Sequence, residues 1–148
     1  MAEDTPKLSA NVMAIVSKAL SNQTCISTFT LAPVGMMRED DSSGIEEAAD
    51  FLIRREGVET VVVFGVVNSK MLVGSLHTTS GTVDPEKWIR ALLEEDESLE
   101  IEEADAGLCR FQANLGLLGK CKEKSRLWLI TEQFVTDRFV EKIGVVDD

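Results

Sequence analysis

Apolar residues recur along the chain at two kinds of spacing, and each kind predicts a different element. Spacings of three and four, which lay one apolar stripe along a helix, occur in four segments: residues 9–22, 43–57, 84–93 and 122–143. The expected start signals are Ser9, Ser43 with Glu46 in capping-box spacing, and Asp84 followed by Pro85. Gly57 and Gly144 stand where glycine commonly ends a helix. We therefore expect four helices.

Two segments in the first half of the chain have the composition of strands. Residues 24–32 alternate in polarity, are rich in β-branched side chains and end at Pro33. Residues 58–67 are almost continuously apolar, which is typical of a central strand covered on both faces. The first segment is expected to be a single strand, and the second to lie in the middle of the sheet.

The remaining strands are predicted from turns and interruptions. Asn68-Ser69 is expected to turn the central strand into a hairpin partner over residues 70–78, and residues 108–118 supply another strand or two. Helices and strands thus alternate, which predicts an α/β fold with a mixed, mostly helix-covered sheet of about five strands. We expect a single domain over residues 1–148, with a flexible start at residues 1–8.

The charge of the chain is concentrated in one segment. The formal net charge is −11, and eight acids without a base lie between Glu94 and Asp105. An acidic chain repels phosphate groups at long range, so nucleic acid is not expected as a ligand of this chain alone. We expect residues 94–107 to form a solvated acidic loop or edge.

The sequence also bears on the compartment. Its longest apolar runs, such as residues 61–67, fall far short of the roughly 20 residues of a membrane helix. Residues 1–8 lack the basic segment and apolar segment of a signal peptide. We expect a cytoplasmic protein with no membrane contact. The widely spaced Cys25, Cys109 and Cys121 are expected to be buried or half-buried thiols, with a metal site or a disulfide as the alternative.

The common signatures of catalysis and cofactor binding are absent from the sequence. It contains no dinucleotide or phosphate-binding glycine motif, no nucleophile-elbow motif, no HExxH and no CxxC. With His77 as the single histidine, a histidine-based catalytic or metal centre has only one place to form. We expect no catalytic residue, no metal site and no cofactor.

One polar stretch is a candidate ligand site. It joins the end of a strand to the start of a helix and contains Ser75, His77, Thr78, Thr79, Ser80 and Gly81. Loop N–H groups, hydroxyls and a helix N-terminus can together bind an anion. The alternative is an ordinary surface loop, because Asp84 already occupies the helix N-terminus and would repel a second anion.

Several short stretches also resemble a known family. They are Ala48-Ala49-Asp50-Phe51-Leu52, Glu56-Gly57-Val58, residues 60–67, Gly74-Ser75-Leu76-His77, Leu115-Gly116-Leu117-Leu118-Gly119, Lys122-Glu123-Lys124, Asp137-Arg138-Phe139 and Ile143-Gly144-Val145. In order and spacing, from about Asn11 to Val146, they are similar to DHH-associated domain 1 of the DHH phosphoesterase superfamily, which includes nanoRNases and exonucleases. The last four resemble the closing segment of that domain in an archaeal-type branch.

The resemblance implies a role in substrate binding, but this chain lacks the residues that the family uses for it. In that family a DHH domain holds manganese ions, and the associated domain grips the nucleotide end of the substrate. The family's strand carries Ser-x-Arg, often with another Arg, where this chain has Ser75, His77 and Thr79. Its Gly-rich stretch ending in histidine has no counterpart between Leu93 and Gln112. Since only a guanidinium forms a permanently charged phosphate clamp, we expect the ancestral nucleic-acid binding to be lost.

The leading hypothesis is therefore a diverged DHH-associated domain without activity of its own, which binds a protein or a small ligand through its acidic segment and an exposed edge. The expected protein partner is a DHH-domain protein or a second copy of the chain. One alternative is the substrate-binding module of a manganese-dependent DHH phosphoesterase whose catalytic domain is on another chain or was removed. The other is a small-molecule sensor that uses the loop over residues 75–82.

Overall fold

The computed structural model describes residues 9–105 and 107–147, so the start expected to be flexible, residues 1–8, lies outside the described residues. The elements, in chain order, are α1 (Ala10–Asn22), β1 (Thr24–Ile26), β2 (Phe29–Met37), the 3-10 helix η2 (Glu39–Asp41), α2 (Ser43–Leu52), β3 (Thr60–Val67), β4 (Met71–Thr78), α3 (Pro85–Leu92), β5 (Glu100–Asp105), β6 (Leu108–Asn114), the 3-10 helix η3 (Gly116–Lys120) and α4 (Lys124–Asp147).

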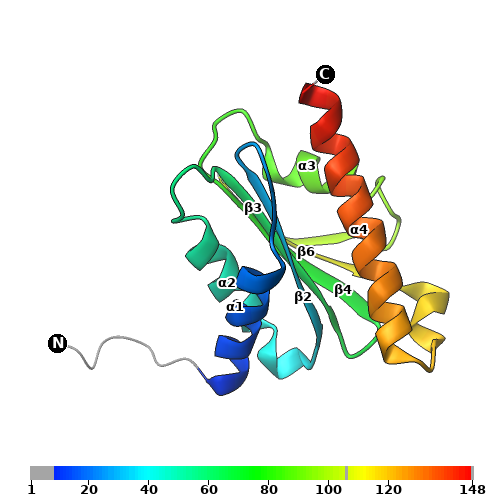
Figure 1. Ribbon diagram of the computed structural model, residues 1–148. Helices are drawn as coiled ribbons and strands as arrows, with labels where there is room; N and C mark the ends of the chain where they lie inside the picture. The colour runs from blue at the N-terminus through cyan, green and yellow to red at the C-terminus, as the bar shows by residue number, and fades with distance from the viewer. Residues whose placement is uncertain (1–8, 106, 148) are drawn as a thin grey trace.

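The strands form one mixed sheet in the order β1-β2-β3-β4-β6-β5. Only β2 and β3 are parallel, and α2 connects them, while the other neighbours are antiparallel. Figure 1 shows α1 and α2 on one side of the sheet and α3 and α4 on the other. The predicted α/β class and helix-covered mixed sheet are confirmed, with six strands in the described residues in place of about five.

The core consists of two apolar clusters on opposite faces of the sheet. Successive side chains of a strand point to opposite faces, so β3 contributes Val62 and Phe64 to the cluster under α3 and α4, and Val61 and Val63 to the cluster under α1 and α2. All eight residues of β3 are buried. This confirms the prediction of a central strand covered on both faces.

Helix caps that the sequence predicted are in place at α1 and α3. The Ser9 hydroxyl accepts a hydrogen bond from the Val12 amide, and the Asp84 carboxylate accepts one from the Lys87 amide. Asn68 and Ser69 both have positive φ values, 53° and 60°, as the expected tight hairpin turn between β3 and β4 requires. Local chemistry therefore determines these three boundaries.

The expected single strand over residues 24–32 is wrong. Ser27, with φ of 56°, turns the chain between β1 and β2, and β2 then runs through Pro33 to Met37. Strand β1 pairs only with residues 29–31, so Pro33 lies where β2 no longer needs an N–H for that neighbour. An irregularity in the β2–β3 register follows between Pro33 and Met36.

The predicted ends of two helices are also wrong. Helix α2 ends at Leu52, several residues before Gly57, and α4 continues past Gly144. The capping box of Ser43 and Glu46 does not form: the N-cap is Ser42, and the Glu46 carboxylate turns toward the sheet. Glu46 thus contacts β4 and does not cap its own helix.

The acidic segment is divided between a loop and the edge of the sheet. The side chains of residues 94–97 are exposed after α3, and β5 then pairs with β6 only, as the last strand in the sheet. Glu100 and Glu102 are exposed along this strand. The expectation of a solvated acidic loop or edge over residues 94–107 stays a prediction, since Leu99 within this range is buried and Ala106 lies outside the described residues.

Gly74 marks a close approach between two strands. It pairs with Phe111 of β6, and a Cβ placed on Gly74 would lie 2.3 Å from the Cζ of the Phe111 ring. Phe111 is buried in the cluster under α3 and α4. Position 74 thus has room for a hydrogen atom only, because the aromatic ring occupies the space of a side chain.

Candidate functional site

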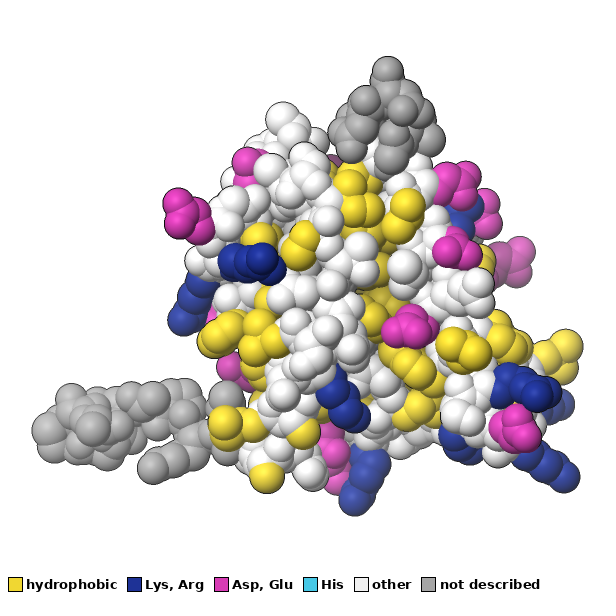
Figure 2. All heavy atoms as spheres, viewed as in Figure 1, with side chains coloured by type: hydrophobic (Ala, Val, Ile, Leu, Met, Phe, Trp, Pro, Cys, Tyr) yellow, Lys and Arg dark blue, Asp and Glu magenta, His cyan; other side chains and the backbone are white. Residues whose placement is uncertain are grey.

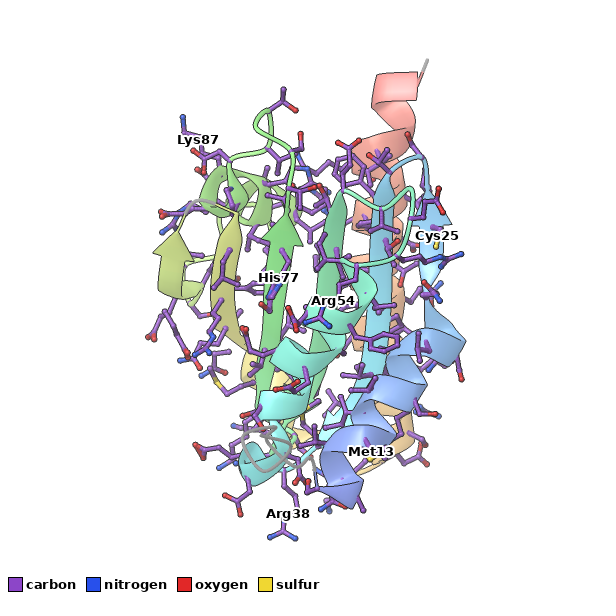
Figure 3. All side chains as sticks on the ribbon, turned by 90° about the vertical axis from the view of Figure 1, so that its left-hand side faces the viewer. Met13, Cys25, Arg38, Arg54, His77 and Lys87 are labelled. Atoms are coloured by element: carbon purple, nitrogen blue, oxygen red, sulfur yellow. The ribbon has the colours of Figure 1, made fainter. Side chains whose placement is uncertain are left out.

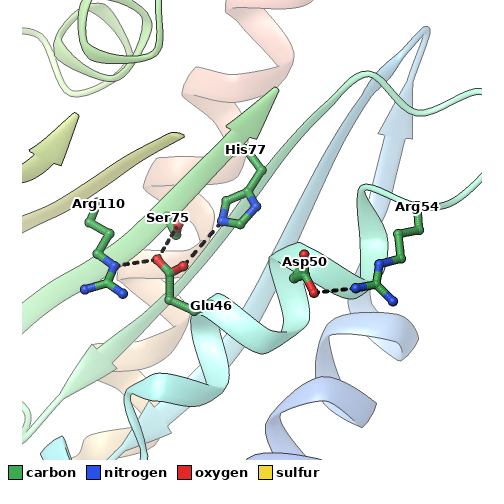
Figure 4. Close-up of polar contacts among 6 residues, drawn as sticks. All are labelled: Glu46, Asp50, Arg54, Ser75, His77 and Arg110. Atoms are coloured by element: carbon green, nitrogen blue, oxygen red, sulfur yellow. Dashed lines mark hydrogen bonds and ion pairs between the residues drawn. The ribbon is translucent and has the colours of Figure 1, made fainter. Parts of the chain in front are cut away.

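Four polar side chains meet where α2 crosses the sheet. Glu46 projects from the first turn of α2, Ser75 and His77 lie on β4, and Arg110 lies on β6 (Figure 4). The Ser75 hydroxyl donates to Glu46 Oε1 at 2.9 Å, and Arg110 Nε donates to the same oxygen at 2.8 Å. His77 Nε2 lies 3.5 Å from Glu46 Oε2. We call these four residues the Glu46 cluster.

The strand register brings the Glu46 cluster together. Ser75 and His77 are two residues apart on β4, so both point to the face that α1 and α2 cover. Figure 3 shows His77 on this face, beside α2. The β4–β6 register places Arg110 directly opposite Ser75. Strands β4 and β6 therefore direct three side chains that can donate hydrogen bonds toward Glu46 on α2.

The cluster keeps the Glu46 carboxylate ionised. The contact with His77, together with the hydrogen bonds from Ser75 and Arg110 and the charge of the guanidinium, lowers the pKa of Glu46 from 4.5 to about 2. Burial opposes this by raising the pKa, and the donors outweigh it. Ser75 and Arg110 make the hydrogen bonds to Glu46, while Nε2 of His77 is buried and has no hydrogen-bond partner among the described residues.

A hollow of about 360 Å³ adjoins the cluster between α2, β4 and β6. Its polar lining consists of Ser42, Ser43, Glu46, Glu47, Glu102 and Arg110. Three carboxylates thus face one guanidinium, and that guanidinium already contacts Glu46. As folded, this hollow does not offer a phosphate group the excess of positive charge that it needs.

The six residues of the predicted ligand site do not form one site. Ser75 and His77 belong to the Glu46 cluster, while Thr78 points to the opposite face, where its hydroxyl lies 2.8 Å from that of Thr60. Thr79 and Ser80 belong to a loop that closes on itself through a 2.8 Å contact between the hydroxyls of Ser80 and Thr82. Successive side chains of β4 point to opposite faces of the sheet, so residues that are adjacent in the sequence lie in different places.

The outer half of the predicted site is an open hollow at the end of β4. Its lining comprises Thr78, Thr79, Ser80, Gly81, Thr82, Val83, Asp84, Pro85 and Gly107. The Thr79 amide donates to the Glu59 carbonyl, and Thr78 Oγ1 accepts from the Ser80 amide. These groups are thus engaged within the chain, and Asp84 caps α3 at the rim. Ligand binding by this loop stays a prediction.

Sequence reasoning missed Glu46 and Arg110 as site residues. Glu46 matched a capping box, a local pattern that hid its contact with residues far away in the chain. Arg110 stands between buried Cys109 and Phe111, as expected of an outward position on a strand. The alternation of buried and exposed residues along β6 could have predicted that Arg110 points away from the buried cluster of Cys109 and Phe111. Only the pairing of β4 with β6 places Arg110 beside Ser75.

The cysteines do not act together. All three are free, with Cys109 buried, Cys121 half-buried and Cys25 exposed, so the expectation of burial is wrong for Cys25. Burial raises the pKa of the Cys109 thiol to about 11. Among the described residues, no group of three or more His, Cys, Asp or Glu side chains could hold a metal ion.

A second concave surface lies on the opposite face, between α4 and the end of β6. It is a mainly apolar groove of about 260 Å³, and we call it the α4 groove. Its lining comprises Leu72, Leu93, Asp96, Ala113, Asn114, Leu115, Leu118, Ile130, Thr131, Phe134 and Val135. Ile130 and Phe134 are 42% and 48% exposed. In Figure 2 apolar side chains gather over α4, with cations near the start of this helix.

Helix α4 is long but not of membrane type. Within residues 9–105 and 107–147, no helix combines the length and the apolar character needed to cross a membrane. Its inner side packs through Val135, Phe139 and Ile143 against the sheet. Its outer side mixes charged residues with exposed apolar ones such as Leu129.

Comparison with known proteins finds similarity to a curated protein and to solved structures. No protein-family model matches the chain. An uncharacterized protein of Methanocaldococcus jannaschii is 25% identical over 146 residues, which are 98% of this chain and 28% of that protein. The chain thus spans less than a third of its relative. The C-Ala domain of alanyl-tRNA synthetase from Aquifex aeolicus superposes with a TM-score of 0.47 at 14% identity, over 77% of this chain and 97% of that domain.

Proposed function

We propose that this chain is a non-catalytic module of the DHH-associated type that binds a partner protein through the α4 groove. The observation that carries the proposal is the groove itself: two adjacent turns of α4 present half-exposed Ile130 and Phe134 beside an apolar hollow. Apolar surface of this kind, rimmed by charge, is typical of protein interaction sites. The length of the M. jannaschii relative, most of which lies outside the match, supports a role as one module among others.

The acidic loop on one side of the α4 groove supports a basic partner surface. Leu93 and Asp96 line the groove, and Glu94, Glu95 and Glu97 belong to the same exposed loop. A partner surface that inserts aliphatic side chains into the groove and places Lys or Arg against this loop would match both features. We assign the partner as a folded DHH-type domain with such a surface, in accordance with the family resemblance.

The acidic edge strand is less suited to be the main contact. Strand β5 has an irregular register between Ile101 and Glu103, and the side chains of Glu100 and Glu102 on this strand are exposed. Both features discourage the addition of a further strand. The acidic segment therefore guides the approach of a basic partner, and the apolar groove holds it.

The binding partner for the test is a DHH-bearing protein encoded with or attached to this chain. We expect the groove variant Ile130→Gln/Phe134→Gln to bind it at least tenfold more weakly, a loss of about 1.4 kcal/mol of binding free energy. Isothermal titration calorimetry with the purified proteins would measure it. The matched control is Leu129→Gln, since Leu129 is 59% exposed on the same helix but does not line the groove. Equal binding by the groove variant, or no binding by the unaltered chain, would contradict the proposal.

A second function is favoured by the position of Arg110. The strand motif of the resembled family has Ser-x-Arg, and here a guanidinium from β6 lies opposite Ser75 in place of one from β4. The chain would then be the substrate-binding module of a manganese-dependent DHH phosphoesterase. Contact with Glu46 weighs against this function, because the guanidinium shares its charge with that carboxylate.

The second function predicts an activity that arises only on mixing. With a manganese-loaded DHH-domain protein, the chain should raise dinucleotide hydrolysis about tenfold, and Arg110→Met should abolish the increase, since a methionine cannot hold a phosphate. Arg54→Met is the control, because Arg54 pairs with Asp50 on the surface of α2 (Figure 4). An unchanged rate on mixing would exclude this function, and clear turnover by the chain alone would exclude both.

A further inference from the structure

The Glu46 cluster has the geometry of an anion site whose occupant comes from the same chain. Three side chains that can donate hydrogen bonds, the Ser75 hydroxyl, the Arg110 guanidinium and the His77 imidazole, converge on the two oxygens of one carboxylate. The three belong to the sheet, and the carboxylate belongs to a helix laid across it. The two halves of the contact are therefore parts of different structural elements.

Ser75 is the rigidly held donor on the sheet side of the cluster. Ser75 is 1% exposed, and it lies in the middle of the fully paired β4. Arg110 projects from the next strand at the paired position, and its guanidinium carries a permanent charge. Ser75 therefore keeps its position without the anion, as a preorganised oxyanion site requires, while the Arg110 side chain is 45% exposed.

From this geometry we propose that Ser75, His77 and Arg110 form an oxyanion-binding site that the Glu46 carboxylate occupies and so holds closed to outside ligands. The ligand class is a small carboxylate, because the present occupant is a carboxylate and two further acids, Glu47 and Glu102, line the adjoining hollow. Phosphate, with its larger negative charge, meets more repulsion from these acids. The depressed pKa of Glu46 supports the proposal, since it reports how strongly the cluster favours an anion.

The adjoining hollow gives an outside anion a route to the site. It has a volume of about 360 Å³ and is lined by Glu46 and Arg110 together with Ser42 and Ser43 at the start of α2. A carboxylate in this hollow lies beside the Arg110 guanidinium, on the side where that guanidinium contacts Glu46. The closed site is a property of this chain alone, so the inference stands whether or not a DHH-type partner binds.

The test removes the occupant and supplies a replacement. In Glu46→Ala, 100 mM sodium acetate should raise the melting temperature by about 3 °C above the same concentration of sodium chloride, as expected for a site with a Kd on the order of tens of millimolar. The chain has one histidine, so the imidazole Cε1–H signal in NMR belongs to His77 and should shift with acetate. The unaltered chain should show neither effect.

Two further variants separate the site from general charge effects. Glu47→Ala removes the same charge from the same hollow but leaves the occupant in place, so acetate should not stabilise it. Glu46→Ala/Arg110→Met should lose the response. If Glu46→Ala does not fold, Glu46→Ser takes its place. Equal stabilisation by acetate and chloride would overturn the proposal, and tighter binding of phosphate than acetate would overturn the assignment to carboxylates.

Discussion

Gly74→Ala is expected to lower the free energy of unfolding by about 3 kcal/mol, the upper range for overpacking a filled core. The added Cβ would lie 2.3 Å from Phe111 Cζ and 2.9 Å from both Cε atoms, closer than any real carbon contact. Phe111 is 2% exposed and pairs directly with Gly74, so the ring cannot turn aside without disturbing its neighbours. Urea unfolding followed by tryptophan fluorescence would measure the loss, because Trp88 and Trp128 pack against the same cluster.

Two comparisons show whether the Phe111 ring causes the effect of Gly74→Ala. Gly81→Ala is the control, since no atom lies within 4 Å of a Cβ at that position, and its effect should stay within about 0.5 kcal/mol. In a Phe111→Leu background, Gly74→Ala should cost at least about 1 kcal/mol less than in the unaltered chain. Equal costs in both backgrounds would show that the ring is not responsible.

Glu46→Gln is expected to lose about 2 kcal/mol of stability near pH 7 and almost none near pH 2. The pKa of Glu46 is lowered from 4.5 to about 2 in the folded chain, so its contribution to stability is fully present above pH 4.5. The contribution falls as pH drops from 4.5 through 2, because protonation then removes the charge that Ser75 and Arg110 stabilise. Partial exposure of the carboxylate keeps the magnitude below the full linkage value.

Unfolding free energies of the unaltered chain and Glu46→Gln, measured side by side from pH 2 to pH 7, test this prediction. Every other carboxyl group titrates in both proteins, so their difference reports on position 46. Ser75→Ala, which removes one donor, should keep only part of the pH-dependent difference. Two parallel curves between pH 2 and pH 5 would show that the Glu46 cluster does not stabilise the carboxylate.

Elements with local signals were predictable from the sequence. The Ser9 and Asp84 caps, the continuous apolar run of β3 and the turn at Asn68 each depend on a few neighbouring residues, and the structure has all of them. Pro33 was predicted to end a strand, but β2 continues through it. A proline fits there because β1 pairs only with residues 29–31 of β2, and the length of β1 is not visible around Pro33 in the sequence. Pairing between distant segments carries no local signal.

The candidate site shows the same division. Ser75 and His77 were named because they belong to a polar stretch between the end of a strand and the start of a helix, which is visible in the sequence. Glu46 and Arg110 were not, because the distance from Glu46 to Arg110 along the chain is 64 residues and only the crossing of α2 over β4 and β6 brings them together. The sequence lacks the family's arginine on β4, and only the pairing of β4 with β6 places the guanidinium of Arg110 opposite Ser75.

The two edge strands of the sheet are poor templates for a further strand. Strand β1 has three residues, and β5 carries exposed Glu100 and Glu102 together with an irregular register. A further strand from a second chain would have to align its amides with a short or kinked, negatively charged template. Fibril-like growth by strand addition is therefore disfavoured at neutral pH.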